Sequence, residues 1–168
     1  MSKLHRIEEP APGATPTEEK SDVAAGDAEV GVNRAEDTRT PYEIVGGEAR
    51  VRELVDRFYD LMDLEPDFAK LRALHGPTLD NARDKLFWFL SGWLGGPSLY
   101  IDRFGHPMLR ARHLPFRIDS EARDQWVICM GRAMMDTGLP EHLQERLLQS
   151  FFQTADWMRN TPDVGKPA

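Results

Sequence analysis

Four long stretches of the chain carry apolar residues at helical spacing, and no other feature limits the fold as strongly. In the first stretch the apolar side chains recur every three or four residues, which places them on one face of an α-helix: Val51, Leu54, Val55, Phe58, Tyr59 and Met62. Comparable stripes occupy about residues 80–94, 120–138 and 140–161. No stretch alternates apolar and polar residues with a period of two, so no β-strand is expected. The sequence therefore predicts an all-α domain.

Shorter segments join these four helices. Pro41–Val45 is long enough for about one helical turn, and Pro66 can open a second short helix. Residues 97–107 have no sustained period, and we expect a loop there. Pro107 and Pro115 confine any helix between them to a few residues, because proline is not tolerated in a helix interior. A simple four-helix bundle does not need such an insertion.

The insertion includes Gly105–Ile118, which reads GHPMLRARHLPFRI and holds two histidines seven residues apart. The second, His113, falls on the last turn of the expected short helix, beside apolar residues and arginines. An imidazole in an apolar slot with cations nearby suits an axial ligand of a haem iron. The alternative is a histidine that caps a helix or fills a polar gap at the edge of the core. These residues alone leave both interpretations open.

The first 40 residues differ from the rest in composition. They contain no Phe, Trp or Tyr, and they carry nine acidic and five basic residues. Such a segment cannot bury enough apolar surface to offset the entropy lost on ordering. We therefore expect a disordered acidic extension over residues 1–40, a folded domain over 41–161 and a flexible tail over 162–168.

Composition also argues against several classes of function. The net charge of −7 argues against nucleic acid as the main partner. No stretch approaches the roughly 18 apolar residues of a membrane span, and the first residues lack the apolar core of a signal peptide, so a cytoplasmic protein is expected. Cys129 is the single cysteine, which excludes an internal disulfide and a CxxCH haem attachment. Any haem would be held non-covalently.

Several motifs in a fixed order resemble one known family. They are YEIVGG, RFYD, KLFWFLSGWLGGP, GHPMLRARHLPFRI and EARDQW, spread over about residues 42–160. In this order and spacing they are similar to the group II truncated haemoglobins. The resemblance implies a two-over-two helical sandwich around a b-type haem.

The resemblance also implies roles for individual residues. His113 matches the proximal ligand of the iron, and Trp126 and Tyr59 match donors on the distal side. His75 aligns with a position that is often Tyr or Phe, although a gap nearby would put Leu74 there; a histidine could hydrogen-bond the gas or compete for the iron. The expected cofactor-binding residues include Arg112 and Lys85 for the haem propionates and, along the pocket, Phe58, Ala82, Leu86, Phe89, Tyr100, Leu109, Phe116 and Met130.

The function that the resemblance implies is reversible binding of dioxygen, or of another diatomic gas such as NO or CO. One alternative is a haem-dependent redox enzyme, an NO dioxygenase or a peroxidase, that uses an external reductase. Another is a haem-based sensor whose acidic extension contacts a partner. Either a monomer or a homodimer is compatible with the sequence.

Overall fold

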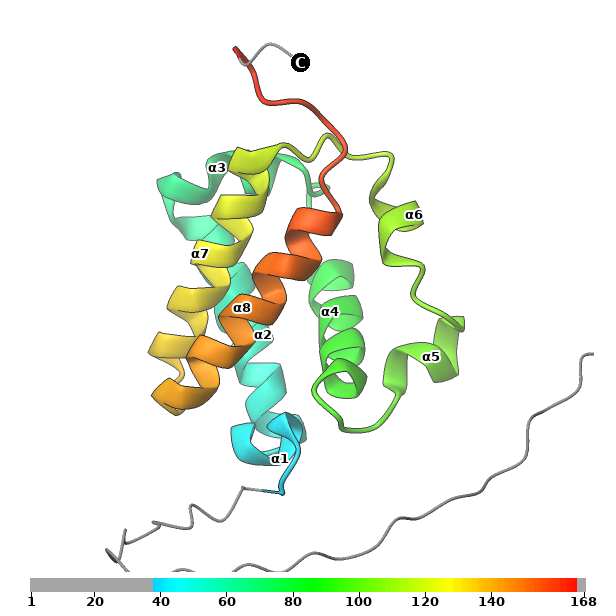
Figure 1. Ribbon diagram of the computed structural model, residues 1–168, viewed down its shortest axis with the longest axis vertical. Helices are drawn as coiled ribbons and strands as arrows, with labels where there is room; N and C mark the ends of the chain where they lie inside the picture. The colour runs from blue at the N-terminus through cyan, green and yellow to red at the C-terminus, as the bar shows by residue number, and fades with distance from the viewer. Residues whose placement is uncertain (1–37, 166–168) are drawn as a thin grey trace, which may run out of the picture. The chain divides into compact units, whose positions relative to one another are not determined.

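The structure, a computed structural model, describes residues 38–165, and all its regular elements are helices (Figure 1). In chain order they are α1 (Pro41–Val45), α2 (Glu48–Leu64), the 3₁₀ helix η1 (Pro66–Phe68), α3 (Ala69–Ala73), α4 (Asp80–Trp93), α5 (Leu99–Phe104), α6 (Leu109–His113), α7 (Ser120–Asp136) and α8 (Glu141–Trp157). The predicted all-α class is confirmed. Apart from residues 38–40 and 162–165, the expected disordered extension and flexible tail lie outside the described residues. Within 38–165 no helix is long and apolar enough to cross a membrane.

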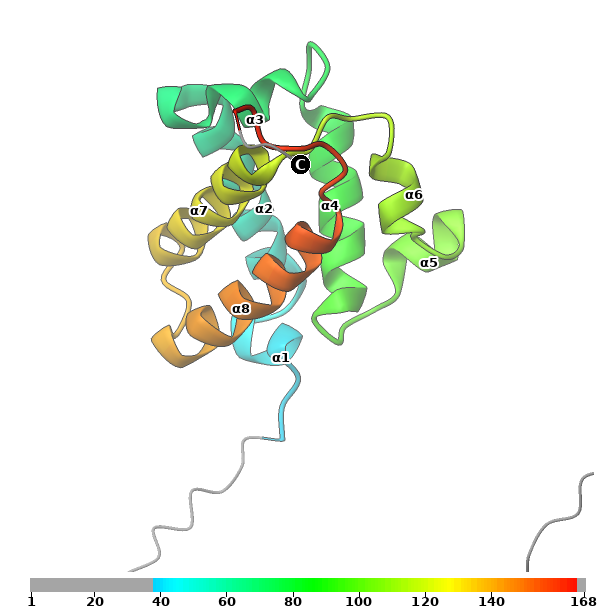
Figure 2. The ribbon, with the colours of Figure 1, turned by 45° about the horizontal axis from the view of Figure 1, so that its top comes forward.

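The four long helices form two antiparallel pairs. Helices α2 and α4 make one pair, α7 and α8 make the other, and α2 packs against α7 where the pairs meet (Figures 1 and 2). Most of the fully buried side chains lie on α2 and α7, on the inner faces that the helical period predicts: Val51, Leu54, Val55, Phe58, Cys129, Met130, Ala133 and Met134. This is the predicted two-over-two arrangement.

Helix α4 has a second apolar face that the sequence pattern did not reveal. The predicted inner face included Ala82, Leu86 and Phe89, and all three are only half-buried. Phe87, which lies off that stripe, is instead buried with 6% of its surface exposed. The guanidinium of Arg52 on α2 lies 5.2 Å from the centre of the Phe87 ring, so this face meets α2. Leu79 and Leu90 of the predicted stripe are buried as well, and its other members pack half-buried against the core.

The loop predicted over residues 97–107 is wrong in part, because Leu99–Phe104 forms helix α5. Tyr100 is the one buried residue of this helix, and its ring lies 5.0 Å from that of Phe104 one turn later. Six residues with a single buried position cannot produce a detectable apolar period. The sequence therefore contained too little pattern to predict this helix.

Helix α6 forms between the two prolines as predicted and ends at His113. It lies at the margin of the domain, beyond α4 and next to α5 (Figure 2). None of its residues is buried. Phe116, just after it, is also 44% exposed. The residues that flank the short helix, Met108, Leu114 and Phe116, thus present large apolar side chains that the rest of the domain does not cover.

A close contact between Gly96 and the first helix joins the start of the domain to the end of α4. The Tyr42 amide donates to the Leu94 carbonyl at 2.9 Å. A Cβ atom on Gly96 would lie 2.5, 2.6 and 2.7 Å from three carbons of the Tyr42 ring. Only glycine therefore allows the Tyr42 ring to pack here.

We expect Gly96→Ala to lower the free energy of unfolding by about 1–3 kcal/mol, the usual cost of forcing atoms into a packed site. Urea unfolding of the purified protein measures this change. Gly76→Ala is the matched control, since a Cβ on Gly76 would meet nothing within 4 Å. Equal stability of the Gly96→Ala protein and the wild type would contradict the packing described for Tyr42.

Candidate functional site

The imidazole of His113 is fixed by its own helix. Its Nδ1 atom lies 2.6 Å from the carbonyl oxygen of Leu109, one turn earlier. A carbonyl oxygen only accepts, so Nδ1 carries the proton and donates. The other ring nitrogen, Nε2, then has a lone pair. A half-buried imidazole oriented in this way is the usual form of a metal-ligating histidine.

Three aromatic residues that the sequence singled out lie together between α2 and α7. The ring centre of Phe58 is 5.0 Å from that of Tyr59 and 5.3 Å from that of Trp126. Phe58 is completely buried and Tyr59 is 5% exposed, whereas Trp126 is half-buried. The two donors predicted for one side of the pocket, a phenol and an indole, are therefore separated by a single phenylalanine ring.

Tyr59 is held as a neutral phenol. Burial is the largest influence and raises the pKa of Tyr59, while the positive charge of Arg83 opposes it only in part. The Arg83 guanidinium lies 5.7 Å from the centre of the Tyr59 ring. The neutral phenol keeps its O–H proton. Its proton remains available for a bound molecule.

His75 lies on the other side of Tyr59, with 5.9 Å between the two ring centres. Its Nδ1 atom donates to the Leu71 carbonyl at 3.0 Å, so the neutral ring has its lone pair on Nε2. Burial lowers the pKa of His75 most; the Leu71 hydrogen bond raises it, while the charge of Arg72 and the nearby His113 ring lower it further. The neutral form is therefore favoured. In that form Nε2 accepts a hydrogen bond or binds a metal and cannot donate.

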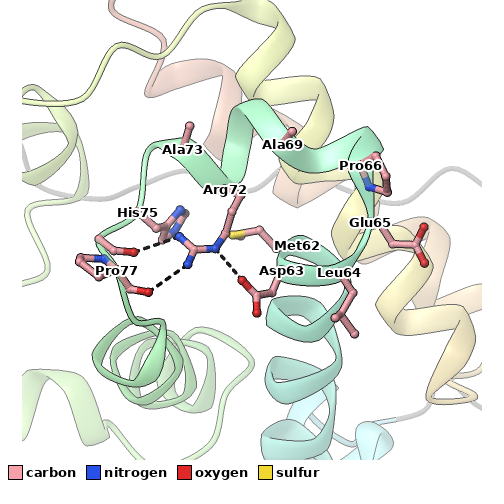
Figure 3. A pocket seen from close by; sticks show the side chains of 11 residues that line it. Met62, Asp63, Leu64, Glu65, Pro66, Ala69, Arg72, Ala73, His75 and Pro77 are labelled. Carbon is pink, nitrogen blue, oxygen red and sulfur yellow. Dashed lines mark hydrogen bonds and ion pairs between the residues drawn. The ribbon is translucent and has the colours of Figure 1, made fainter.

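An open pocket of about 690 Å³ lies beside His75 on the surface, between the end of α2 and one face of α3 (Figure 3). Arg72 lines the pocket and holds the loop after α3 in place through hydrogen bonds (Figure 3). Its guanidinium donates to Asp63 at 2.7 Å and to the carbonyls of Gly76 and Pro77 at 2.9 and 3.2 Å. His75 thus separates this pocket from Tyr59 and sits in a loop that Arg72 ties to α2.

The remaining predicted residues divide into a connected group and separate positions. Phe89 contacts Tyr100 at 6.4 Å between ring centres, and the Arg112 guanidinium lies 6.0 Å from the Tyr100 ring. The rings of His113 and Phe116 are 6.4 Å apart. Lys85 is exposed on α4. The structure thus joins α4, α5 and α6 through Tyr100 but leaves Lys85 apart.

Three further residues act on this region and were missed from the sequence. Arg83 lies over Tyr59 and is held by Asp60 at 2.6 Å. The Cys129 thiol donates to the Phe58 carbonyl at 3.3 Å, which fixes the backbone beside Tyr59. The side chain of Gln125 accepts from the Leu71 amide at 2.9 Å. Only Gln125 could have been noticed from the sequence, because it directly precedes Trp126.

These residues fit a haem. His113 offers one neutral nitrogen on an element with no buried residue, and half-buried apolar side chains of α4 lie on the adjoining helix. Arg112, exposed one position before His113, suits an anionic group at the edge of such a ring system. A buried phenol on α2 and a half-buried indole on α7 complete the set. The fold and these residues are those expected of a helical haem-binding protein.

Comparison with known proteins agrees with this class. The family model for bacterial-like globins matches residues 40–160. The group 2 truncated haemoglobin YjbI of Bacillus subtilis is 42% identical over 124 residues, which are 74% of this chain and 91% of that protein. A cold-adapted truncated haemoglobin from the Antarctic bacterium Pseudoalteromonas haloplanktis superposes with a TM-score of 0.71 at 47% identity, covering 73% of this chain and 99% of that one.

A solved structure described as a truncated oxygen-avid haemoglobin from Bacillus subtilis gives a TM-score of 0.67 at 41% identity, with 73% of this chain and 100% of that chain covered. The chain therefore belongs to the bacterial-like globin family and is a group 2 truncated haemoglobin. As a globin it is a haem protein.

Proposed function

We propose that this globin reversibly binds dioxygen, and other diatomic gases such as NO and CO, at a non-covalently held haem b. Haem, when bound, supplies the iron that holds the gas. The single observation that carries the proposal is the His113 imidazole, whose Nδ1 is committed to the Leu109 carbonyl at 2.6 Å. Nε2 is thereby the only nitrogen of this ring free to ligate a metal.

Tyr59 and Trp126 would stabilise the gas from the opposite side. Dioxygen held by ferrous haem gains partial negative charge, and buried donors stabilise such charge in a low-dielectric site. The Tyr59 hydroxyl has its proton available, and the indole N–H is a donor in every state. A hydrogen bond to a charged group contributes about 1.5–3 kcal/mol, so two donors favour slow release of dioxygen. The description of a relative as oxygen-avid supports this direction.

His75 has a different role in this proposal, because its neutral ring cannot donate from Nε2. When no gas is present, the lone pair on Nε2 of His75 would accept a hydrogen bond from the Tyr59 hydroxyl. Alternatively, it would ligate the iron in competition with the gas. The first state would have to be broken before Tyr59 could donate to the gas, and the second before the gas could bind. His75 would therefore oppose binding, whereas Tyr59 and Trp126 favour it.

The apolar walls and the cations would orient the haem. Ala82, Leu86, Phe89, Leu109 and Met130 supply apolar surface, with Phe58, Tyr100 and Phe116 as aromatic neighbours. Arg112 and Lys85 would pair with the propionates; both side chains are exposed, which supports this role. Cys129 is buried and bonded to a backbone carbonyl, which supports non-covalent attachment.

We also propose that the protein acts in the cytoplasm as a monomer or homodimer. An external reductase would return oxidised iron to the ferrous state.

Repeated oxygenation of the haem-reconstituted protein tests the proposed function. We expect the ferrous protein to change its absorption spectrum when dioxygen is added and to recover the first spectrum when dioxygen is removed, over several cycles. Immediate conversion to the ferric form in each cycle would contradict reversible binding. That outcome would favour the redox enzyme.

A further inference from the structure

Two consecutive residues of α3 attach this short helix to the first turns of α7. The Lys70 ammonium donates to Asp119 at 2.7 Å and to Glu121 at 2.6 Å. The next residue, Leu71, donates its backbone amide to the Gln125 side chain at 2.9 Å. Helix α3 precedes the loop that holds His75, and α7 carries Trp126. The two attachments therefore join the supports of two distal residues.

The peptide groups of Leu71 link Gln125 directly to His75. Its amide donates to Oε1 of Gln125, and its carbonyl accepts from Nδ1 of His75 at 3.0 Å. The Leu71 side chain is 4% exposed, which fixes the residue between its neighbours. A single buried residue thus connects Gln125 to the imidazole that faces Tyr59.

Gln125 also meets a requirement of α3 itself. The first amides of a helix have no acceptor within the helix, and α3 has no side-chain cap at its start. Leu71 is the third residue of α3, so its amide belongs to this first turn. Without Gln125 that half-buried amide would lose its partner, and α3 would have to shift or admit water to satisfy it.

We propose that Gln125 is a positioning residue of the distal side: through Leu71 it fixes the tautomer and the place of the His75 ring relative to Tyr59. This inference rests on the proposed function, since it assigns the control of a residue of that same site. Gln125 and Trp126 are adjacent on α7. One turn of this helix therefore positions both the Trp126 indole and, through Leu71, the His75 ring. Lys70 contributes less, because its side chain is 35% exposed and its ion pairs are screened by salt.

Two substitutions of Gln125 separate the hydrogen bond from the shape of the side chain. Gln125→Met keeps the length and removes the acceptor, whereas Gln125→Glu keeps an acceptor oxygen. Gln144→Met is the matched control: Gln144 donates to the Leu139 carbonyl at 2.7 Å on α8, away from the distal residues. NMR of the haem-reconstituted CO form gives the exchange rate of the Leu71 amide and the ¹⁵N shifts of the His75 ring.

For Gln125→Met we expect roughly twofold to tenfold faster exchange of the Leu71 amide and altered ¹⁵N shifts of His75. Gln125→Glu and Gln144→Met should leave both near the wild-type values. The dioxygen dissociation rate should change in the same direction as in His75→Phe, and Gln125→Met should have no further effect in a His75→Phe background.

Unchanged His75 shifts in Gln125→Met would overturn the inference. So would an equal change of the dissociation rate with and without His75, because Gln125 would then act on the fold rather than on the histidine. If the wild type does not bind dioxygen reversibly, the proposed function fails, while amide exchange and the His75 shifts still decide whether Gln125 positions His75.

Discussion

His113→Ala is expected to abolish histidine-type haem ligation and to weaken haem retention by at least about a hundredfold. Loss of a partner that merely orients a metal-bound histidine costs about 10–100-fold in metal affinity, and loss of the ligand itself should cost no less. The absorption spectrum and the rate of haem transfer to an excess of apomyoglobin measure the two effects. Added imidazole should restore a histidine-type spectrum, because it replaces the missing nitrogen.

His106→Ala is the control for this substitution. His106 lies seven residues earlier, is exposed, and uses its Nδ1 atom to accept the Met108 amide at 3.2 Å. It is outside α6, so we expect a wild-type spectrum and normal haem retention. A His113→Ala protein that keeps both the spectrum and the haem would show that another residue ligates the iron.

Tyr59→Phe and Trp126→Phe should each raise the dioxygen dissociation rate by roughly tenfold to a hundredfold. Each substitution removes a donor and keeps an aromatic ring, so the contacts of Phe58 with both neighbours are largely preserved. The expected range follows from about 1.5–3 kcal/mol for a hydrogen bond to a charged group, with 1.4 kcal/mol per factor of ten. Stopped-flow replacement of dioxygen by CO measures the rate.

Trp93→Phe controls for the loss of an indole. Trp93 stacks on Phe151 at 4.6 Å between ring centres and has no assigned role at the gas. The dioxygen dissociation rate of Trp93→Phe should equal that of the wild type. Wild-type rates in both Tyr59→Phe and Trp126→Phe would refute the assignment of these residues as donors.

The sequence predicted the parts of the fold that repeat over several helical turns. The stripe through Val51, Leu54 and Phe58 defined α2, and the two prolines around His113 defined α6. Helix α5 could not be predicted because a single buried residue, Tyr100, gives no period. The second face of α4 was missed for a related reason: Phe87 became buried through its contact with α2, which the sequence of α4 alone does not contain.

The candidate site shows the same division. The residues named from the sequence came from a resemblance between motifs, and their types already suited a haem pocket. Gln125 and Arg83 could not be identified in this way, because their roles depend on partners 54 and 23–27 residues away in the chain. Hydrogen bonds between distant segments exist only once the helices have packed. The hydrogen-bonded state of His75 likewise became clear only from its contact with the Leu71 carbonyl.

A crystal structure of the haem-reconstituted ferrous protein with CO would test the central claim most directly. We predict that Nε2 of His113 ligates the iron on one side of the haem, and that Tyr59 and Trp126 line the other side within reach of the gas. Ligation by any residue other than His113, or a gas site remote from both Tyr59 and Trp126, would contradict it.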